Sequence, residues 1–152
     1  MSERDEREIR LGEARRLSQL LICVAEQAKA GFAAAVAPFG LPVPLARAFL
    51  TLGSSAPMRD LADRLACDRS YVTSLADQLE ERGLVARVPG DDRRVKLLAL
   101  TEAGEELRDR MSTALAEQAL VLRRLDDADR AALAPLLEKL VGDDEAGAPA
   151  GW

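Results

Sequence analysis

The amino-acid sequence predicts a mainly α-helical fold that contains one short β-hairpin. Three observations support this: an Ala/Leu-rich composition with few aromatic residues, long stretches with apolar residues at helical spacing, and two strand-like runs around a polar loop. Hydrophobic residues make up 48% of the 152 residues and charged residues 31%, which is typical of a globular chain. We expect one domain, whose core a second copy could extend.

The first long helix is expected over residues 13–39, because its apolar residues fall at the spacing of one helical face. Pro38 and Gly40 end this helix. The preceding charged segment, "MSERDEREIR", can bury little surface by itself. It is either a frayed tail or an arm that becomes ordered only against a partner chain, and we favour the arm.

Two further helices are expected at the C-terminal end. Thr101 caps the first, "TEAGEELRDRMSTALAEQALVLRRL", with Glu102 in its first turn. Asp126 or Asp127 caps the last helix, "DDADRAALAPLLEKLV". The remaining residues, 143–152, have the composition of a disordered tail.

The centre of the chain contains three shorter predicted helices. The first begins near Pro44 and is ended by the segment 53–56. The other two cover residues 57–65 and 69–82 and are joined by "ACD", in which Asp68 is well suited to cap the second. Two helices joined by so short a turn have the geometry of a helix-turn-helix, whose second helix can lie in the DNA major groove.

A β-hairpin is expected directly after this pair of helices. Gly83 ends the second helix, and the runs "LVARV" and "VKLLAL" then flank the loop "PGDDRR". A hairpin in this place makes a winged helix-turn-helix. Arg93 and Arg94 lie in the loop, and arginine is strongly attracted to the negative potential of a narrow minor groove.

The helix over residues 69–82 has one apolar and one polar face. Val72, Leu75 and Leu79 point inward at helical spacing. The side chains left outside are polar and of groove-reading length: Arg69, Ser70, Tyr71, Thr73, Ser74 and Asp77. Any solvated amphipathic helix exposes such residues, so the DNA-binding interpretation depends on their combination with the wing arginines.

The charge of the chain restricts how it could contact nucleic acid. Its formal net charge is -5, which argues against coating DNA or an anionic membrane through bulk positive charge. The segment 58–100 carries as many basic as acidic side chains and is therefore the least acidic part of the chain. Contact with DNA must accordingly be local.

Several function classes are excluded or disfavoured by composition. The chain has no histidine, which removes Ser-His-Asp and Cys-His catalysis and His-ligated metal sites, and its carboxylates are scattered over solvated helix faces. We expect neither an enzyme nor a bound cofactor or metal. Its cysteines, Cys23 and Cys67, form no CxxC motif, and charged residues or glycine interrupt every apolar run. A soluble, cytoplasmic protein is expected.

The residues of the wing and helix-turn-helix resemble those of the MarR family of dimeric winged-helix transcriptional regulators. The family's wing pattern is Asp, any residue, Arg, any three, an aliphatic residue, any residue, and Leu-Thr. "DRRVKLLALT" matches it with Asp92, Arg94, Leu98, Leu100 and Thr101, although Leu98 replaces the usual valine. The segment "LADRLACDRSYVTSLADQLEERGLV" is similar to the family's helix-turn-helix.

This resemblance implies a homodimer that represses transcription by binding a pseudo-palindromic DNA operator. Residues 5–39 and 101–142 would form the dimerisation helices, and residues 43–100 the DNA-binding part. Arg94 would enter the minor groove while Asp92 holds the loop. The helix over 69–82 would read the major groove, with the two copies roughly 34 Å apart.

The resemblance also implies a small effector, commonly an aromatic or lipophilic acid, in a cleft between the dimerisation helices and the winged part. The candidate lining residues are Leu21, Val24, Phe32, Phe39, Phe49 and Met111. A simpler interpretation is that each of these is an ordinary core residue.

Two alternatives stay open from the sequence. One is a redox-sensing regulator, since some family members sense peroxides through a cysteine. Burial as a small apolar residue is the simpler explanation of Cys23, whereas Cys67 lies in the turn before the recognition helix, where oxidation could disturb docking. The other alternative is a winged helix that binds protein rather than DNA, as the net negative charge would allow.

Overall fold

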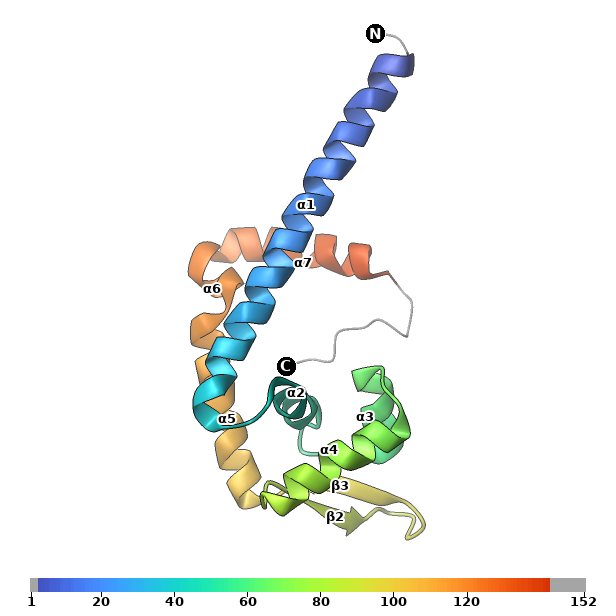
Figure 1. Ribbon diagram of the computed structural model, residues 1–152, viewed down its shortest axis with the longest axis vertical. Helices are drawn as coiled ribbons and strands as arrows, with labels where there is room; N and C mark the ends of the chain where they lie inside the picture. The colour runs from blue at the N-terminus through green and yellow to red at the C-terminus, as the bar shows by residue number, and fades with distance from the viewer. Residues whose placement is uncertain (1–2, 143–152) are drawn as a thin grey trace.

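The computed structural model describes residues 3–142 and contains a winged domain between long terminal helices (Figure 1). The first helix, α1 (Glu3–Val36), is followed by a 3-10 turn, η1 (Ala37–Phe39). The N-terminal half of α1 extends as a rod beyond the rest of the molecule (Figure 1). The charged start of the chain is therefore helical in a single copy, which corrects the expectation of order only against a partner. Glu and Arg are good helix formers, and their mixed signs allow favourable pairs along the helix.

The winged domain follows α1 in the predicted order, with one addition. The expected turn at 53–56 contributes to a third strand, so the two-stranded wing belongs to a three-stranded antiparallel sheet of order β1-β3-β2. β1 has only three residues, ends in proline and buries only Ala56, so it has no alternation of its own and forms by pairing with β3. The elements are α2 (Val43–Thr51), β1 (Ser55–Pro57), α3 (Met58–Leu65), α4 (Arg69–Glu81), β2 (Val85–Pro89) and β3 (Lys96–Leu100).

The hydrophobic core lies where α2, α3 and α4 pack over the sheet. Val72, Leu75 and Leu79 of α4 are all buried, as the helical spacing predicts. Fully burying a side chain of this size contributes roughly 1.5–3 kcal/mol. The largest fully buried side chains include Phe49, Leu45, Leu52, Leu61, Leu79, Leu98 and Met111.

The C-terminal part is broken into more pieces than the sequence predicts. In place of one helix through residue 125, α5 (Glu102–Gln118) ends at Ala119, where the backbone is extended, and α6 (Leu120–Arg124) follows. Neither Gly nor Pro lies at this break. α6 contacts α1, and a Cβ at Gly31 of α1 would lie 3.5 Å from the Gln118 carbonyl oxygen, so the break accompanies the packing of the two segments.

The predicted helix caps have mixed outcomes. Thr101 caps α5, and its Oγ1 accepts a hydrogen bond from the Gly104 amide at 3.1 Å. Asp126 caps α7 (Asp127–Val141) by accepting from the Asp129 amide at 2.8 Å. Asp68 lies at the predicted N-cap position of α4, but its side chain makes no capping hydrogen bond there. The predicted position is therefore correct and the predicted side-chain cap is wrong. The predicted tail, 143–152, lies outside the described residues.

A close backbone contact joins α5 to the end of α4. Gly83 has φ of 71°, the left-handed conformation expected after a helix. The Thr101 hydroxyl donates to the Gly83 carbonyl at 2.6 Å, and the Thr101 amide donates to the Leu84 carbonyl at 3.1 Å. A Cβ at Gly104 would lie 2.0 Å from the Leu84 carbonyl oxygen, so only glycine permits this approach.

The first helix is more apolar than expected from the sequence, where charged residues or glycine interrupt every apolar run. The helical stretch Glu3–Phe39 contains a window with mean hydropathy of 1.5, of which 11% is buried. By length and composition alone, this stretch is apolar enough to cross a membrane, although charged residues interrupt it. A single helix of this kind is weak support for a membrane protein, because a core helix of a soluble protein passes the same test.

Replacing Gly104 with alanine is expected to lower the free energy of unfolding by about 1–3 kcal/mol or more, because the added Cβ must displace the Leu84 backbone. Chemical denaturation at fixed protein concentration measures this. Gly12→Ala is the control: no atom lies within 4 Å of its Cβ position, and alanine in an exposed helix should be stabilising by up to about 1 kcal/mol. Equal stability of the two variants would contradict the close-contact interpretation.

Candidate nucleic-acid interface

The polar face of α4 is exposed along its length. Tyr71 retains 47% of its accessible surface, and the opposite face of the helix is buried against the core. Helical periodicity puts Ser70, Thr73 and Asp77 on one stripe. All the side chains that the sequence analysis assigned to this face are exposed: Arg69, Ser70, Tyr71, Thr73, Ser74 and Asp77.

The two halves of α4 differ in how many of their polar side chains make hydrogen bonds or ion pairs within the protein. In the first half, Thr73 Oγ1 donates to the Arg69 carbonyl at 2.9 Å. Over the described residues, no side-chain hydrogen bond or ion pair engages Arg69, Ser70 or Tyr71. The N-terminal half of α4 therefore keeps donors and acceptors free for another molecule.

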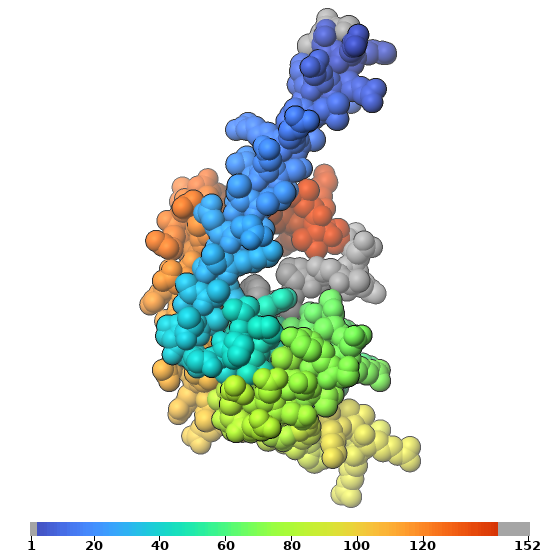
Figure 2. Space-filling view, viewed as in Figure 1, coloured from blue at the N-terminus to red at the C-terminus, as the bar shows by residue number. Residues whose placement is uncertain are grey.

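The wing loop has an internally bonded backbone and outward side chains. The Gly90 amide donates to the Val95 carbonyl at 2.8 Å, and the Val95 amide donates to the Asp92 carbonyl at 2.9 Å. Asp92 Oδ1 accepts from the Arg94 amide at 3.0 Å, so the aspartate holds the backbone of Arg94 and leaves its guanidinium unrestrained. Arg93 and Arg94 are exposed, and the loop projects from the molecule (Figure 2).

A third arginine of the hairpin has a different role, which the sequence analysis missed. Arg87 of β2 donates from its two terminal nitrogens to Glu80 and to Asp77 of α4. The hydrogen bond that Arg87 donates to Asp77 is the main reason that the pKa of Arg87 is raised, and burial opposes it. Asp77 is thus bonded to the wing strand. No sequence motif predicts this pairing, because it depends on how the hairpin folds back beside α4.

The predicted effector-site residues lie in three different environments. Phe49 and Met111 are fully buried in the core, whereas Phe32 and Phe39 are partly buried against it. Leu21 and Val24, with 45% and 48% of their surface accessible, lie on the open side of α1. In a single chain these residues do not line one common surface, and the effector site stays a prediction.

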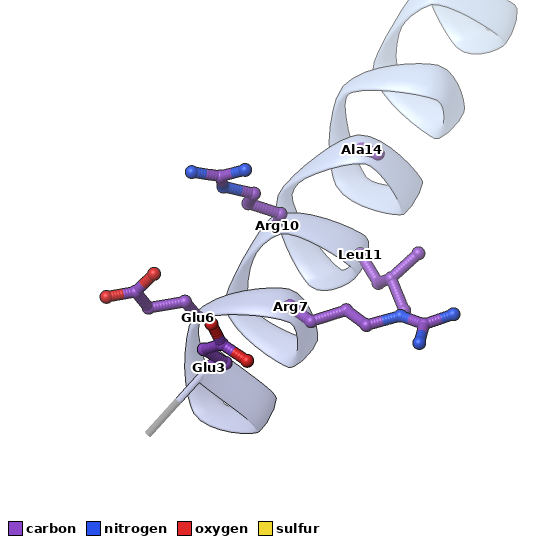
Figure 3. Close-up of a pocket in the computed structure, with 6 residues that line it drawn as sticks. All are labelled: Glu3, Glu6, Arg7, Arg10, Leu11 and Ala14. Carbon is purple, nitrogen blue, oxygen red and sulfur yellow. The ribbon is translucent and has the colours of Figure 1, made fainter. Parts of the chain in front are cut away.

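A shallow hollow of about 510 Å³ lies elsewhere, along the projecting arm of α1 (Figure 3). Every residue that lines it belongs to this one helix, so the hollow has no opposite wall. It contains none of the predicted effector-site residues. Its lining residues are Glu3, Glu6, Arg7, Arg10, Leu11 and Ala14. Among the described residues, no group of His, Cys, Asp or Glu could hold a metal ion.

The two cysteines are both free thiols in different surroundings. Cys23 is exposed, so the expectation that it is buried is wrong for a single chain. Cys67 is partly buried. Burial and, second, the neighbouring Asp68 raise the pKa of the Cys67 thiol, and Arg47 opposes them. A raised pKa lowers the thiolate fraction, which disfavours rapid oxidation of Cys67.

The reaction of Cys67 with iodoacetamide, measured in a Cys23→Ser background, should rise at a higher pH in the folded protein than in urea. The thiolate is the nucleophile, and a raised pKa delays its formation. Asp68→Asn should shift the folded-state profile to lower pH, because it removes a negative charge that opposes the thiolate. Asp91→Asn, in the wing loop, is the control that should leave it unchanged. An unmoved profile in the Asp68 variant would contradict this assignment.

Comparison with known families gives a match inside the winged domain. The sequence model of the MarR family matches residues 52–96, which extend from the end of α2 to the start of β3. No curated protein sequence matches the chain.

Solved structures match over most of the chain. A MarR-family transcriptional regulator from Rhodococcus sp. RHA1 is 28% identical, with a TM-score of 0.68 over 84% of this chain and 93% of that one. CouR from Rhodococcus jostii RHA1, bound to p-coumaroyl-CoA, is also 28% identical, with a TM-score of 0.70 over 84% of this chain and 92% of its own.

A more distant match shows the same fold in a DNA complex. It is a mutant MarR from E. coli with operator DNA, 21% identical, with a TM-score of 0.67 over 85% of this chain and 96% of that one. The sequence match covers the winged domain, and the structural matches extend over more than four fifths of the chain. The resemblance to the MarR family is therefore confirmed, and the chain has the winged-helix fold of that family's transcriptional regulators.

Proposed function

We propose that this chain is a homodimeric, effector-responsive transcriptional repressor that binds a pseudo-palindromic DNA operator. The observation that carries the proposal is the pairing of two exposed features. One is the start of α4, where the side chains of Arg69, Ser70 and Tyr71 make no hydrogen bond or ion pair, and the other is the pair of outward arginines in the wing loop. The first suits reading of base edges in the major groove, and the second suits a flanking minor groove. Such a protein acts where DNA is, which fits a cytoplasmic location.

Within the wing, Arg94 is the residue most suited to enter the minor groove. The hydrogen bond from its amide to Asp92 limits the backbone conformations of the loop tip, while the guanidinium stays exposed. A fixed backbone lowers the entropy lost when the side chain inserts. Arg93 precedes it without such a bond and is suited to a phosphate contact, which positions the protein without reading sequence.

The proposed homodimer is supported by apolar side chains that a single copy leaves exposed. Monomeric proteins rarely expose large contiguous apolar surfaces. A partner's matching helices would cover these side chains, and the same burial explains the high hydropathy of α1. The exposed residues on α1, α6 and α7 are Ile9, Leu11, Leu17, Leu20, Leu21, Ile22, Val24, Val121, Leu122, Leu136, Leu137, Leu140 and Val141.

For the effector, we propose a small aromatic or lipophilic acid bound between α1, α5 and the winged domain. CouR, at 28% identity, was solved with p-coumaroyl-CoA, a ligand with an aromatic acyl group. In this chain the Arg110 guanidinium lies 5.5 Å from the centroid of the Phe39 ring, so an aromatic surface and a cation lie together beside η1. A thermal-shift screen of aromatic acids tests this, because a ligand that binds the folded state raises the melting temperature.

Arg94→Ala is expected to weaken operator binding by about 1–3 kcal/mol, because it removes a specific groove contact. Gel-shift titration with the promoter region next to the gene measures this. Arg123→Ala is the matched control: this exposed arginine lies on α6, outside the winged domain, and its loss should leave affinity close to that of the wild type. Unchanged affinity of the Arg94 variant would contradict the role given to the wing.

Introducing lysines at Leu136 and Leu140 is expected to convert the dimer to a monomer at micromolar concentration. Both side chains are exposed on α7 in a single copy, so the change is harmless unless a partner covers them. Sedimentation-equilibrium analysis measures the mass. Val95→Lys on the wing replaces another exposed apolar side chain and should leave the mass unchanged. A dimer that persists in the α7 variant would show that α7 is outside the interface.

A further inference from the structure

The C-terminal half of the α4 stripe carries negative charge where the proposed function brings DNA. Asp77 follows Ser70 by about two helical turns, and Glu80 follows Thr73 by the same spacing, so both carboxylates continue the exposed stripe that begins with groove-reading side chains. Their side chains keep 53% and 40% of their accessible surface. Like charges that are brought together at an interface oppose binding.

Arg87 lies beside both carboxylates. One guanidinium donates to Asp77 through Nη2 and to Glu80 through Nη1, which is the two-pronged geometry that favours arginine over lysine. The Arg87 side chain is 29% exposed, so it is more enclosed than either of its partners. With the arginine in place, the cluster has one net negative charge; without it, the cluster would have two.

The arrangement does not serve mainly to hold the wing in position, because other contacts already do so. Leu84 and Val85, at the base of the hairpin, are buried in the core. The Leu84 amide donates to the Leu79 carbonyl at 3.0 Å, and Thr101 bonds both Gly83 and Leu84. The additional bonds from Arg87 reach the exposed stripe of α4. They change the charge of this stripe more than they strengthen the attachment of the wing.

We propose that Arg87 is a positioning residue for DNA binding, which acts by offsetting part of the negative charge of Asp77 and Glu80 so that the recognition helix can approach the phosphate backbone. This inference rests on the proposed DNA-binding function and extends it. Arg87 itself does not contact the DNA. It holds the two carboxylates away from the phosphates and orients them toward the wing.

The test is a double-mutant cycle between Arg87→Gln and the pair Asp77→Asn with Glu80→Gln. The probe is a fluorescein-labelled duplex that carries the site enriched by the wild-type protein from a random-sequence library. With the carboxylates present, Arg87→Gln should weaken binding on the order of tenfold or more. In the protein that lacks both carboxylates, the same change should weaken it less than about threefold, and the carboxylate variant alone should bind at least as tightly as the wild type.

Two other outcomes would each overturn the proposal. If Arg87→Gln lowers the DNA affinity by the same factor with and without the carboxylates, Arg87 contacts DNA directly. The slope of affinity against salt concentration should then fall by close to one phosphate contact. If the carboxylate variant binds as weakly as Arg87→Gln, the ion pairs act as a mechanical tether. Lys29→Gln, which removes a cation from the exposed ion pair with Glu26 on α1, is the control for lost positive charge and should leave affinity unchanged.

Folding and function are controlled separately. Thermal melts of every variant show whether a lost affinity reflects a lost structure. Arg87→Lys keeps the charge but not the two-pronged geometry, so it should recover part of the affinity that Arg87→Gln loses. If the wild-type protein binds neither the selected duplex nor a random duplex at low salt, the proposed function fails and this inference fails with it. If the wild-type protein binds and the cycle shows no coupling, only the role of Arg87 is wrong.

Discussion

The first turn of α5 lies against the backbone that leaves α4, and only a glycine at position 104 permits this contact. The Leu84 carbonyl accepts the Thr101 amide there, while the Thr101 hydroxyl donates to the Gly83 carbonyl at 2.6 Å and also caps α5. One small junction therefore ends the recognition helix, starts the hairpin and directs the helix that leaves the winged domain. The orientation of the DNA-reading elements relative to the long terminal helices depends on it.

This dependence has a consequence for regulation. Between β3 and α5 the chain has no flexible linker, so a shift of α5 must be transmitted to the turn after α4. A second contact has the same effect, because Arg108 of α5 donates to the Gly53 carbonyl at 2.8 Å, just before β1. A ligand that moved α5 against α1 would thus change the position of α4 and the wing together. Such coupling needs two packed arrangements of α5, which the effector would favour unequally.

The sequence predicted the elements whose stabilising interactions are local. Helical spacing identified α3, α4 and the buried side of α4, and the turn residues identified the hairpin. Three features were missed because they arise from tertiary contacts: β1 forms only through its pairing with β3, the break at Ala119 accompanies packing on α1, and Arg87 meets its carboxylates only once the hairpin has folded. Cys23 was expected to be buried because a periodic pattern cannot show whether an apolar face is covered within one chain.

The chain is acidic overall, yet it is proposed to bind DNA. The basic side chains that other groups of the protein do not already bond explain how both can hold. In the segment 58–100, Arg59 pairs with Asp60, Arg64 donates to Thr51, and Arg82 donates to Gln78. Arg87 is bonded to two carboxylates. Over the described residues, the basic side chains of this segment that have no such bond lie at the start of α4 and on the wing: Arg69, Arg93, Arg94 and Lys96.

Within this segment, the unbonded positive charge therefore lies at the two places that the proposed docking brings to DNA. Long-range attraction depends on the whole charge distribution and is screened by salt, so a net charge of -5 slows encounter rather than preventing it. Contact itself depends on the cations that reach phosphates and grooves, because each one that does so releases condensed counterions. An arginine that is bonded to carboxylates adds little to that release, but it lets a neighbouring acidic stretch lie close to DNA. Within one hairpin, the roles proposed for Arg87 and Arg94 are thus complementary.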